Sequence, residues 1–282
     1  MAEHRFRIVN VFTRDRGALT GNPLCVFEDG RGLDDATMQA LARQFNLSET
    51  TFILPSEKAT ARVRIFTPSY EMPFAGHPTL GTAHVVRSLK AAGDAIALEM
   101  KAGTIPVNAQ GDRWTLQAVA PTSRAFELHR SELEDILGLQ AGDVAEWPLW
   151  CSAGKEQLVV PLASAEAVRR ARPRADAFSR LKSVDGNSMA YIFHDAGDAS
   201  GTVLSRFFFP SGPAILEDPA TGSACANLGA WYTVVRPRTD VKRVVSQGEA
   251  VRRPSTLYLD VTHGAIHVGG DVVELGRGSL SL

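Results

Sequence analysis

The chain has 282 residues, of which 44% are hydrophobic and 22% are charged, as in ordinary soluble globular proteins. These proportions argue against an intrinsically disordered protein and against a fibrous one. The net charge is −1, and the basic residues are dispersed apart from the RRARPR segment at 169–174, so no nucleic-acid-binding surface is indicated.

A chain of this length is expected to form two domains. Its N-terminus lacks the apolar core of a signal peptide, and no segment approaches the ~18 apolar residues of a membrane span. We therefore expect a cytoplasmic protein. The three cysteines, Cys25, Cys151 and Cys225, are too widely spaced for a disulfide framework or a paired-cysteine zinc site. We expect them to be buried, reduced thiols.

The first half of the chain predicts short strands and two helices. One helix is indicated by acidic residues after Gly32, apolar residues at helical spacing and Asn46 as its stop. A second helix, rich in small residues, is predicted from Pro78 to about Ala91. Alternating or β-branched runs predict strands at 5–13, 23–28, 50–55, 61–68, 95–100, 103–110 and 113–119.

The second half predicts the same kinds of element in the same order. Helices are expected at 133–139, after Ser164 as a cap, and from Gly222 to Val235. The predicted strands are 157–162, 189–195, 201–210, 241–248, 255–262, 265–270 and 272–276. The repeated order indicates an internal duplication in pattern.

Two junctions join a glycine to a helix of small residues: GHPTLGTA at 76–83 and TGSACANLGA at 221–230. A helix that begins at glycine leaves its first N–H groups unpaired at the positive end of its dipole, where a carboxylate binds well. Helices this poor in charged side chains are expected inside the fold, each surrounded by a sheet. We therefore expect domains at 1–123 and 124–269, with a final strand at about 270–282 that crosses back to the first domain.

Ionisable side chains lie close to both junctions. Glu71 precedes the first junction, His77 lies within it, and Glu217 and Asp218 precede the second. Glu49 follows the stop of the first helix and directly precedes an apolar strand, where a partly buried carboxyl would suit a general acid/base. Each also has a structural interpretation: Glu71 and Glu217 as helix-end or turn charges, and Glu49 as the solvated start of a strand.

Four motifs, in this order, are similar to those of a known family. They are FNLSET; RIFTP with EMPFAGHPTLGTAHVV; FFFP with EDPATGSACANLGAW; and QG with RPS. On these motifs the chain, from about Val9 onward, resembles the PhzF family of phenazine-biosynthesis-type isomerases, whose fold is that of diaminopimelate epimerase. The resemblance implies an α+β fold of two similar domains. Each is an antiparallel, β-barrel-like sheet around a central helix, with the active site in the interdomain cleft.

The resemblance also implies roles for individual residues. Glu49 corresponds to the family's acid/base carboxylate, and His77 and Asp218 are expected to bind and polarise the ring substituents. The substrate-binding residues implied in the same way are Gly76, Thr221, Gly222 and Ser223. In the family's parent reaction a proton leaves one ring carbon of a dihydro-hydroxyanthranilate and returns to another. One carboxylate can perform both transfers with no metal and no organic cofactor.

The expected substrate is therefore a small cyclic or unsaturated amino or hydroxy carboxylic acid, and a homodimer is expected from the resemblance alone. One alternative is a racemase or epimerase of a small acid. It is disfavoured because Ala75 and Thr221 stand where the diaminopimelate epimerase relatives carry their two catalytic thiols. A second alternative is a non-catalytic binder of small carboxylates. A third, a metal hydrolase using His77 and His84, lacks a nearby carboxylate to complete a ligand set.

Overall fold

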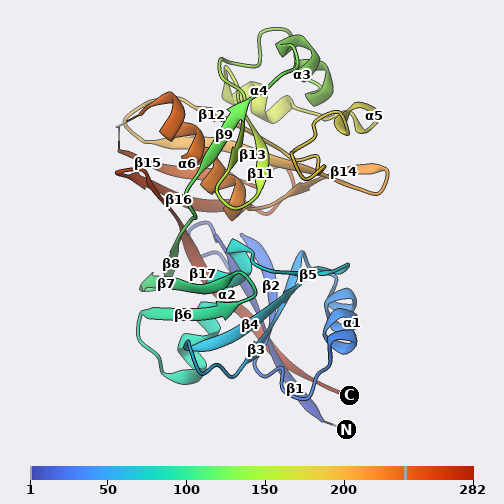
Figure 1. Ribbon diagram of the computed structural model, residues 1–282, viewed down its shortest axis with the longest axis vertical. Coiled ribbons are helices and arrows are strands. Elements are labelled where there is room, and N and C mark those ends of the chain that lie inside the picture. The colour runs from blue at the N-terminus through green and yellow to red at the C-terminus, as the bar shows by residue number, and fades with distance from the viewer. Residues whose placement is uncertain (1, 238–239) are drawn as a thin grey trace. The chain divides into compact units, whose positions relative to one another are not determined.

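The computed structural model describes residues 2–237 and 240–282. The chain forms two compact units: unit 1 contains Met1–Gln117 and Gly269–Leu282, and unit 2 contains Ala118–Val268 (Figure 1). The domains proposed from the sequence, 1–123 with 270–282 and 124–269, have boundaries close to those of these units. Among the described residues, no helix has both the length and the apolar character needed to cross a membrane.

The strands of unit 1 form a closed sheet. They are β1 (Glu3–Val11), β2 (Asn22–Phe27), β3 (Glu49–Leu54), β4 (Ala61–Phe66), β5 (Glu71–Met72), β6 (Ala95–Met100), β7 (Gly103–Gln110), β8 (Arg113–Gln117) and most of β17 (Ala265–Ser281). The pairs run β1–β2–β3–β4–β6–β7–β8–β17, and β17 pairs again with β1. The short β5 pairs with β4 alongside this ring.

Unit 2 contains a similar sheet and more helices than unit 1. Its strands are β9 (Thr122–Ala125), β10 (Leu149–Ser152), β11 (Glu156–Pro161), β12 (Ala190–Asp195), β13 (Thr202–Ser211), β14 (Ala214–Asp218), β15 (Val241–Gln247) and β16 (Ser255–Thr262). The pairs run β9–β10–β11–β12–β13–β15–β16, and β14 pairs with β13. Its helices are α3 (Arg130–Leu137), α4 (Ala165–Arg170), α5 (Ala175–Phe178) and α6 (Gly222–Val235).

The duplication predicted from the pattern is visible in the strand connections. In unit 1, α1 (Asp35–Phe45) joins the parallel pair β2–β3, and α2 (Gly76–Lys90) joins the parallel pair β4–β6 after the short β5. In unit 2, α4 and α5 join the parallel pair β11–β12, and α6 joins the parallel pair β13–β15 after the short β14. Each sheet is thus mixed, and the expectation of purely antiparallel sheets is wrong at these four pairs. Neighbouring parallel strands require a crossover connection, and here each crossover contains a helix.

The two small-residue helices lie inside these sheets. Helix α2 contacts seven strands of unit 1, namely β1, β2, β3, β4, β6, β7 and β8, and Figure 1 shows it among them. Helix α6 contacts β9, β10, β11 and β16. Small residues are needed because the sheet lies close: a Cβ on Gly229 would lie 2.7 Å from Ile266. Helix α2 begins at Gly76, slightly before the predicted start at Pro78.

The predicted helix ends are confirmed where a side chain or a backbone conformation marks them. The Asp34 side chain accepts a hydrogen bond from the Thr37 N–H at the start of α1, and Asn46 ends that helix with a left-handed backbone, φ 51°. The Ser164 hydroxyl accepts from the Ala167 N–H at the start of α4, as predicted. These ends depend on residues within one helical turn, so they can be read from the sequence.

The predicted pair of strands at 265–270 and 272–276 is wrong in one respect: both belong to β17, a single strand of 17 residues. Gly269 and Gly270 are the last two residues of the first predicted strand. In the structure they let other residues approach closely: a Cβ on Gly269 would lie 2.5 Å from the Thr115 hydroxyl, and one on Gly270 would overlap the Phe12 ring. Glycine in a strand here marks a close contact rather than a turn.

Substituting Gly81 tests the close packing of α2. A Cβ at Gly81 would lie 2.7 Å from Leu24 and 2.9 Å from Val11. We expect Gly81→Val to lower the free energy of unfolding by about 1–3 kcal/mol, because extra methyl groups overfill a packed core. Chemical denaturation measures the effect, and Gly93→Val is the control, since a Cβ at Gly93 has no atom within 4 Å. Equal stability of the two variants would contradict the close packing.

Candidate active site

Glu49 and His77 meet in unit 1. Glu49 is the first residue of β3, three residues after Asn46 ends α1. Side chains alternate along a strand, so Glu49 points to the same side as Thr51, whose hydroxyl lies 2.8 Å from that of Thr82 in α2. His77 is the second residue of α2. The local structure of both segments therefore directs the carboxylate towards the start of the central helix.

The pair is close and largely buried. His77 Nδ1 lies 3.0 Å from Glu49 Oε2, and the two side chains are 6% and 16% exposed. The contact is an ion-pair contact rather than a hydrogen bond. Glu49 Oε2 and His77 Nε2 are buried without a hydrogen-bond partner among the residues that the structure describes. A buried polar atom without a partner costs roughly 1–3 kcal/mol, so this arrangement is suited to a polar ligand that contacts both atoms.

The start of α2 itself offers backbone donors. Its N-cap residue, Ala75, makes no side-chain hydrogen bond to the first turn. The Thr79 hydroxyl donates a hydrogen bond to the Ala75 carbonyl at 2.6 Å. This bond satisfies a carbonyl and does not cap any N–H group of the first helical turn. The sequence-predicted residue Gly76 therefore opens a helix whose positive end lacks a side-chain cap, next to His77.

The second junction brings Asp218 and Thr221 together in unit 2. Asp218 ends β14, and its Oδ2 accepts from the Thr221 hydroxyl at 2.5 Å. Gln247, the last residue of β15, donates from Nε2 to the Thr221 hydroxyl at 3.0 Å and to the Asp218 carbonyl at 2.9 Å. Gln247 is fully buried. It holds Thr221 so that the threonine proton faces the Asp218 carboxylate.

Ser223 and Gly222 begin α6, and again no side chain caps the helix. The Ser223 Oγ accepts from Gln157 Nε2 in β11 at 3.1 Å. Gln157 and Gln247 were not predicted as site residues. Gln247 does belong to the QG motif that carries the family resemblance, so a signal for it was present, whereas Gln157 has no local signal.

The structure therefore places the predicted residues in two groups. Unit 1 brings together Gly76, His77 and Glu49, and unit 2 brings together Asp218, Thr221, Gly222 and Ser223. The expectation that both groups bind one substrate rests on the resemblance and stays a prediction.

The other two acidic residues near the junctions form structural ion pairs. Glu71 lies in β5, where Arg64 Nε donates to it at 2.8 Å and Lys101 adds a second contact. Arg64, followed by Lys101, holds the pKa of the Glu71 carboxyl below its usual value. Glu217 lies in β14 and pairs with Arg206 at 2.7 Å. The expectation of helix-end or turn positions is wrong, because both residues pair across neighbouring strands.

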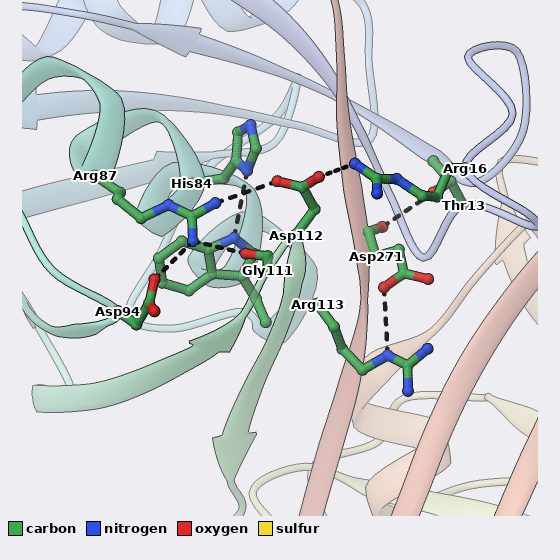
Figure 2. Close-up of polar contacts among 10 residues, drawn as sticks. Thr13, Arg16, His84, Arg87, Asp94, Gly111, Asp112, Arg113 and Asp271 are labelled. Atoms are coloured by element: carbon green, nitrogen blue, oxygen red, sulfur yellow. Dashed lines mark hydrogen bonds and ion pairs between the residues drawn. The ribbon is translucent and has the colours of Figure 1, made fainter.

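His84 has a structural role in the packing of α2. Its Nδ1 accepts from Trp114 Nε1 at 3.3 Å, and Figure 2 shows it beside Arg87. Burial lowers the pKa of His84 to about 4, with a smaller contribution from the charge of Arg87. His84 is thus neutral at pH 7. Among residues 2–237 and 240–282, no group of three or more histidine, cysteine or acidic side chains is arranged to hold a metal ion.

The low pKa of His84 predicts an acid-sensitive fold. The folded pKa lies below the unfolded value of about 6.5, so stability is full above that value and falls as the pH drops towards 4. At pH 4 the protonation of His84 is expected to lower the free energy of unfolding by about 3 kcal/mol. Urea unfolding of wild type and His84→Gln from pH 7 to pH 4 measures it. A constant stability difference between the two proteins across that range would contradict the assignment.

The cysteines are all buried and free, as predicted. Burial raises the pKa of Cys151 to about 12 and those of Cys25 and Cys225 still further above the usual thiol range. Only the thiolate is an effective base or nucleophile. With Ala75 and Thr221 at the helix starts, a two-thiol racemase mechanism has no support.

Comparison with known proteins shows the family of this chain. A sequence model of the PhzC-PhzF family, described as phenazine biosynthesis-like protein, matches residues 9–278. An uncharacterized isomerase of Pasteurella multocida is 34% identical over 99% of this chain and 95% of its own length. Trans-2,3-dihydro-3-hydroxyanthranilate isomerase of Pseudomonas aeruginosa is 33% identical over 90% of this chain and 89% of its own.

Comparison with solved structures supports the same family. The crystal structure of the Bacillus anthracis phenazine biosynthesis protein of the PhzF family matches with a TM-score of 0.88 and 25% identity, over 100% of both chains. The predicted α+β fold of the diaminopimelate epimerase type is confirmed, with two similar halves each built around a small-residue helix. The chain therefore belongs to the PhzC-PhzF family of phenazine biosynthesis-like proteins and is an isomerase.

Proposed function

We propose that this protein is a cofactor-independent isomerase that moves a proton on a small cyclic or unsaturated amino or hydroxy carboxylic acid. The model substrate is trans-2,3-dihydro-3-hydroxyanthranilate, after which its Pseudomonas aeruginosa relative is named. The observation that carries the proposal is the buried Glu49–His77 pair at the uncapped start of α2.

The proposed reaction uses Glu49 twice. Its carboxylate removes a proton from one ring carbon, and the electron pair of the broken C–H bond enters the conjugated system of the substrate. The resulting carboxylic acid then returns the proton to a different ring carbon, where the new C–H bond takes up an electron pair. Atoms and charge balance, and Glu49 ends as the carboxylate it was at the start. Such proton transfer by a positioned side chain accelerates reactions by about 10²- to 10⁴-fold.

His77 and the second junction serve to bind and polarise the substrate in this proposal. His77 Nε2 lacks a partner among the described residues and is suited to a hydrogen bond with a polar ring substituent. The start of α6 offers backbone N–H groups and the Ser223 hydroxyl to a carboxylate. Asp218 is assigned to a ring substituent. The homodimer and the independence from metals and organic cofactors remain predictions from the resemblance.

Isomerisation in deuterated water tests the proposal. Wild-type protein is incubated with trans-2,3-dihydro-3-hydroxyanthranilate and the ring positions are followed by NMR. We expect a shifted double bond, with deuterium at the newly protonated carbon to the extent that the carboxyl proton exchanges with solvent. A protein that binds this compound without isomerisation and without exchange would instead be a non-catalytic carboxylate binder.

A further inference from the structure

The side-chain amides of Asn227 and Gln157 are buried in unit 2 and form a hydrogen-bonded row that ends at Ser223. Asn227 follows Ser223 by four positions in α6 and therefore lies on the same face of the helix. Gln157, in the neighbouring strand β11, bridges the two: its Oε1 accepts from Asn227 Nδ2 at 2.8 Å, and its Nε2 donates to Ser223 Oγ at 3.1 Å. Asn227 is 0% and Gln157 is 1% exposed.

Backbone groups set the direction of this row. The Ala153 N–H can only donate, and it does so to Asn227 Oδ1 at 2.6 Å. The Lys155 carbonyl can only accept, and it does so from Asn227 Nδ2 at 2.8 Å. Turning the Asn227 amide over would place donor against donor and acceptor against acceptor. Its Nδ2 must therefore face Gln157, which turns Gln157 Oε1 towards Asn227 and Gln157 Nε2 towards Ser223.

This direction decides what Ser223 can offer a ligand. Its oxygen accepts from Gln157, so its proton cannot lie along that contact and must point elsewhere. We infer that Gln157 and Asn227 are positioning residues that keep the Ser223 hydroxyl a hydrogen-bond donor to the substrate. The inference rests on the proposed function, in which Ser223 binds the substrate carboxylate, and it adds a source of selectivity. A helix start that presents only donors favours a carboxylate over the corresponding neutral amide.

Substitutions that reverse the hydrogen-bond direction along this row test the inference. In Gln157→Glu the carboxylate only accepts, so Ser223 must turn its proton towards residue 157. Isothermal titration with anthranilate (2-aminobenzoate) as the probe is expected to show about ten- to hundredfold weaker binding than wild type, since a hydrogen bond to a charged group is lost. Gln157→Met removes the donor without imposing a direction, so we expect a change within about threefold. Equal losses in both variants would mean a merely structural role and would overturn the inference.

The added charge of Gln157→Glu requires a control. The same substitution is made in a Ser223→Ala protein, where repulsion of the ligand persists but no hydroxyl can turn. The effect of Gln157→Glu should then shrink to a few-fold. A full ten- to hundredfold effect in the absence of the hydroxyl would attribute the loss to repulsion and contradict the inference. Should Gln157→Glu not fold, Asn227→Asp reverses the row from its other end and is expected to weaken anthranilate binding similarly.

A measurement without any ligand separates this inference from the proposed function. Neutron diffraction of the deuterated protein locates the deuterium on the Ser223 oxygen. We expect it away from Gln157, and a deuterium between Ser223 Oγ and Gln157 would overturn the inference whatever the substrate is. Wild-type protein that neither binds anthranilate nor isomerises the model substrate would contradict the proposed function, and the neutron map would still decide the direction of the row.

Discussion

Glu49→Gln is expected to lower turnover of trans-2,3-dihydro-3-hydroxyanthranilate by about 10²- to 10⁴-fold, the usual contribution of a positioned acid/base. The amide keeps the shape of the carboxyl and its contact with His77, which lies 3.0 Å from Glu49 Oε2, but it cannot carry the proton between two ring carbons. Deuterium uptake into the substrate, followed by NMR, should fall with the turnover.

Two controls accompany this variant. Glu57→Gln changes an exposed glutamate of the same unit and should leave turnover unchanged. The thermal unfolding and the anthranilate affinity of Glu49→Gln should stay close to those of wild type, which separates a chemical loss from an unfolded or non-binding protein. Undiminished turnover would move the acid/base role elsewhere, with Asp218 as the next candidate.

Glu217→Leu is expected to cost about 3–5 kcal/mol of unfolding free energy, because it leaves a buried charge without its partner. Arg206 and Glu217 are 9% and 8% exposed and lie 2.7 Å apart. The Arg206 guanidinium also stacks on Phe208, with its Cζ 4.7 Å from the ring centroid. It donates a hydrogen bond to the Ala171 carbonyl at 2.8 Å. It thus holds the end of α4 to β13 and cannot easily move to water.

Urea denaturation measures the loss, with the exposed Glu146→Leu as the matched control in the same unit. The control should change stability by no more than about 0.5 kcal/mol. A Glu217→Leu protein as stable as the control would show that Arg206 finds water or another partner, and the pair would then have no structural role.

The sequence alone was sufficient for features that depend on neighbouring residues. The acidic residues after Gly32 and the stop at Asn46 were enough to place α1, because helix-end signals act within one helical turn. The Gly76 and Gly222 junctions predicted two buried helices because a helix exposed to solvent would show a charged face, which these two lack. Glu49 and His77 were selected as candidates by their motifs, and the repeated order of elements indicated the duplication.

Short and long strands were harder to predict. The strands β9 and β10 have four residues each, too few for an alternating pattern to stand out from a loop. The strand predicted at 265–270 was ended at Gly270, although β17 continues through Gly269 and Gly270. Whether glycine marks a turn or a close approach depends on what lies opposite, here Thr115 and Phe12, and that is a tertiary fact.

The family, the two small-residue helices and the candidate acid/base could be predicted from the sequence, because each depends on a motif of contiguous residues. Three features depend on how distant segments pack. They are the 3.0 Å contact of His77 with Glu49, the ion pair of Glu217 with Arg206, and the orientation of Thr221 and Ser223 by two buried glutamines. Gln157 lies 66 positions from Ser223 along the chain. A buried amide far away in sequence leaves no local pattern, because its role exists only once the strand and the helix have packed together.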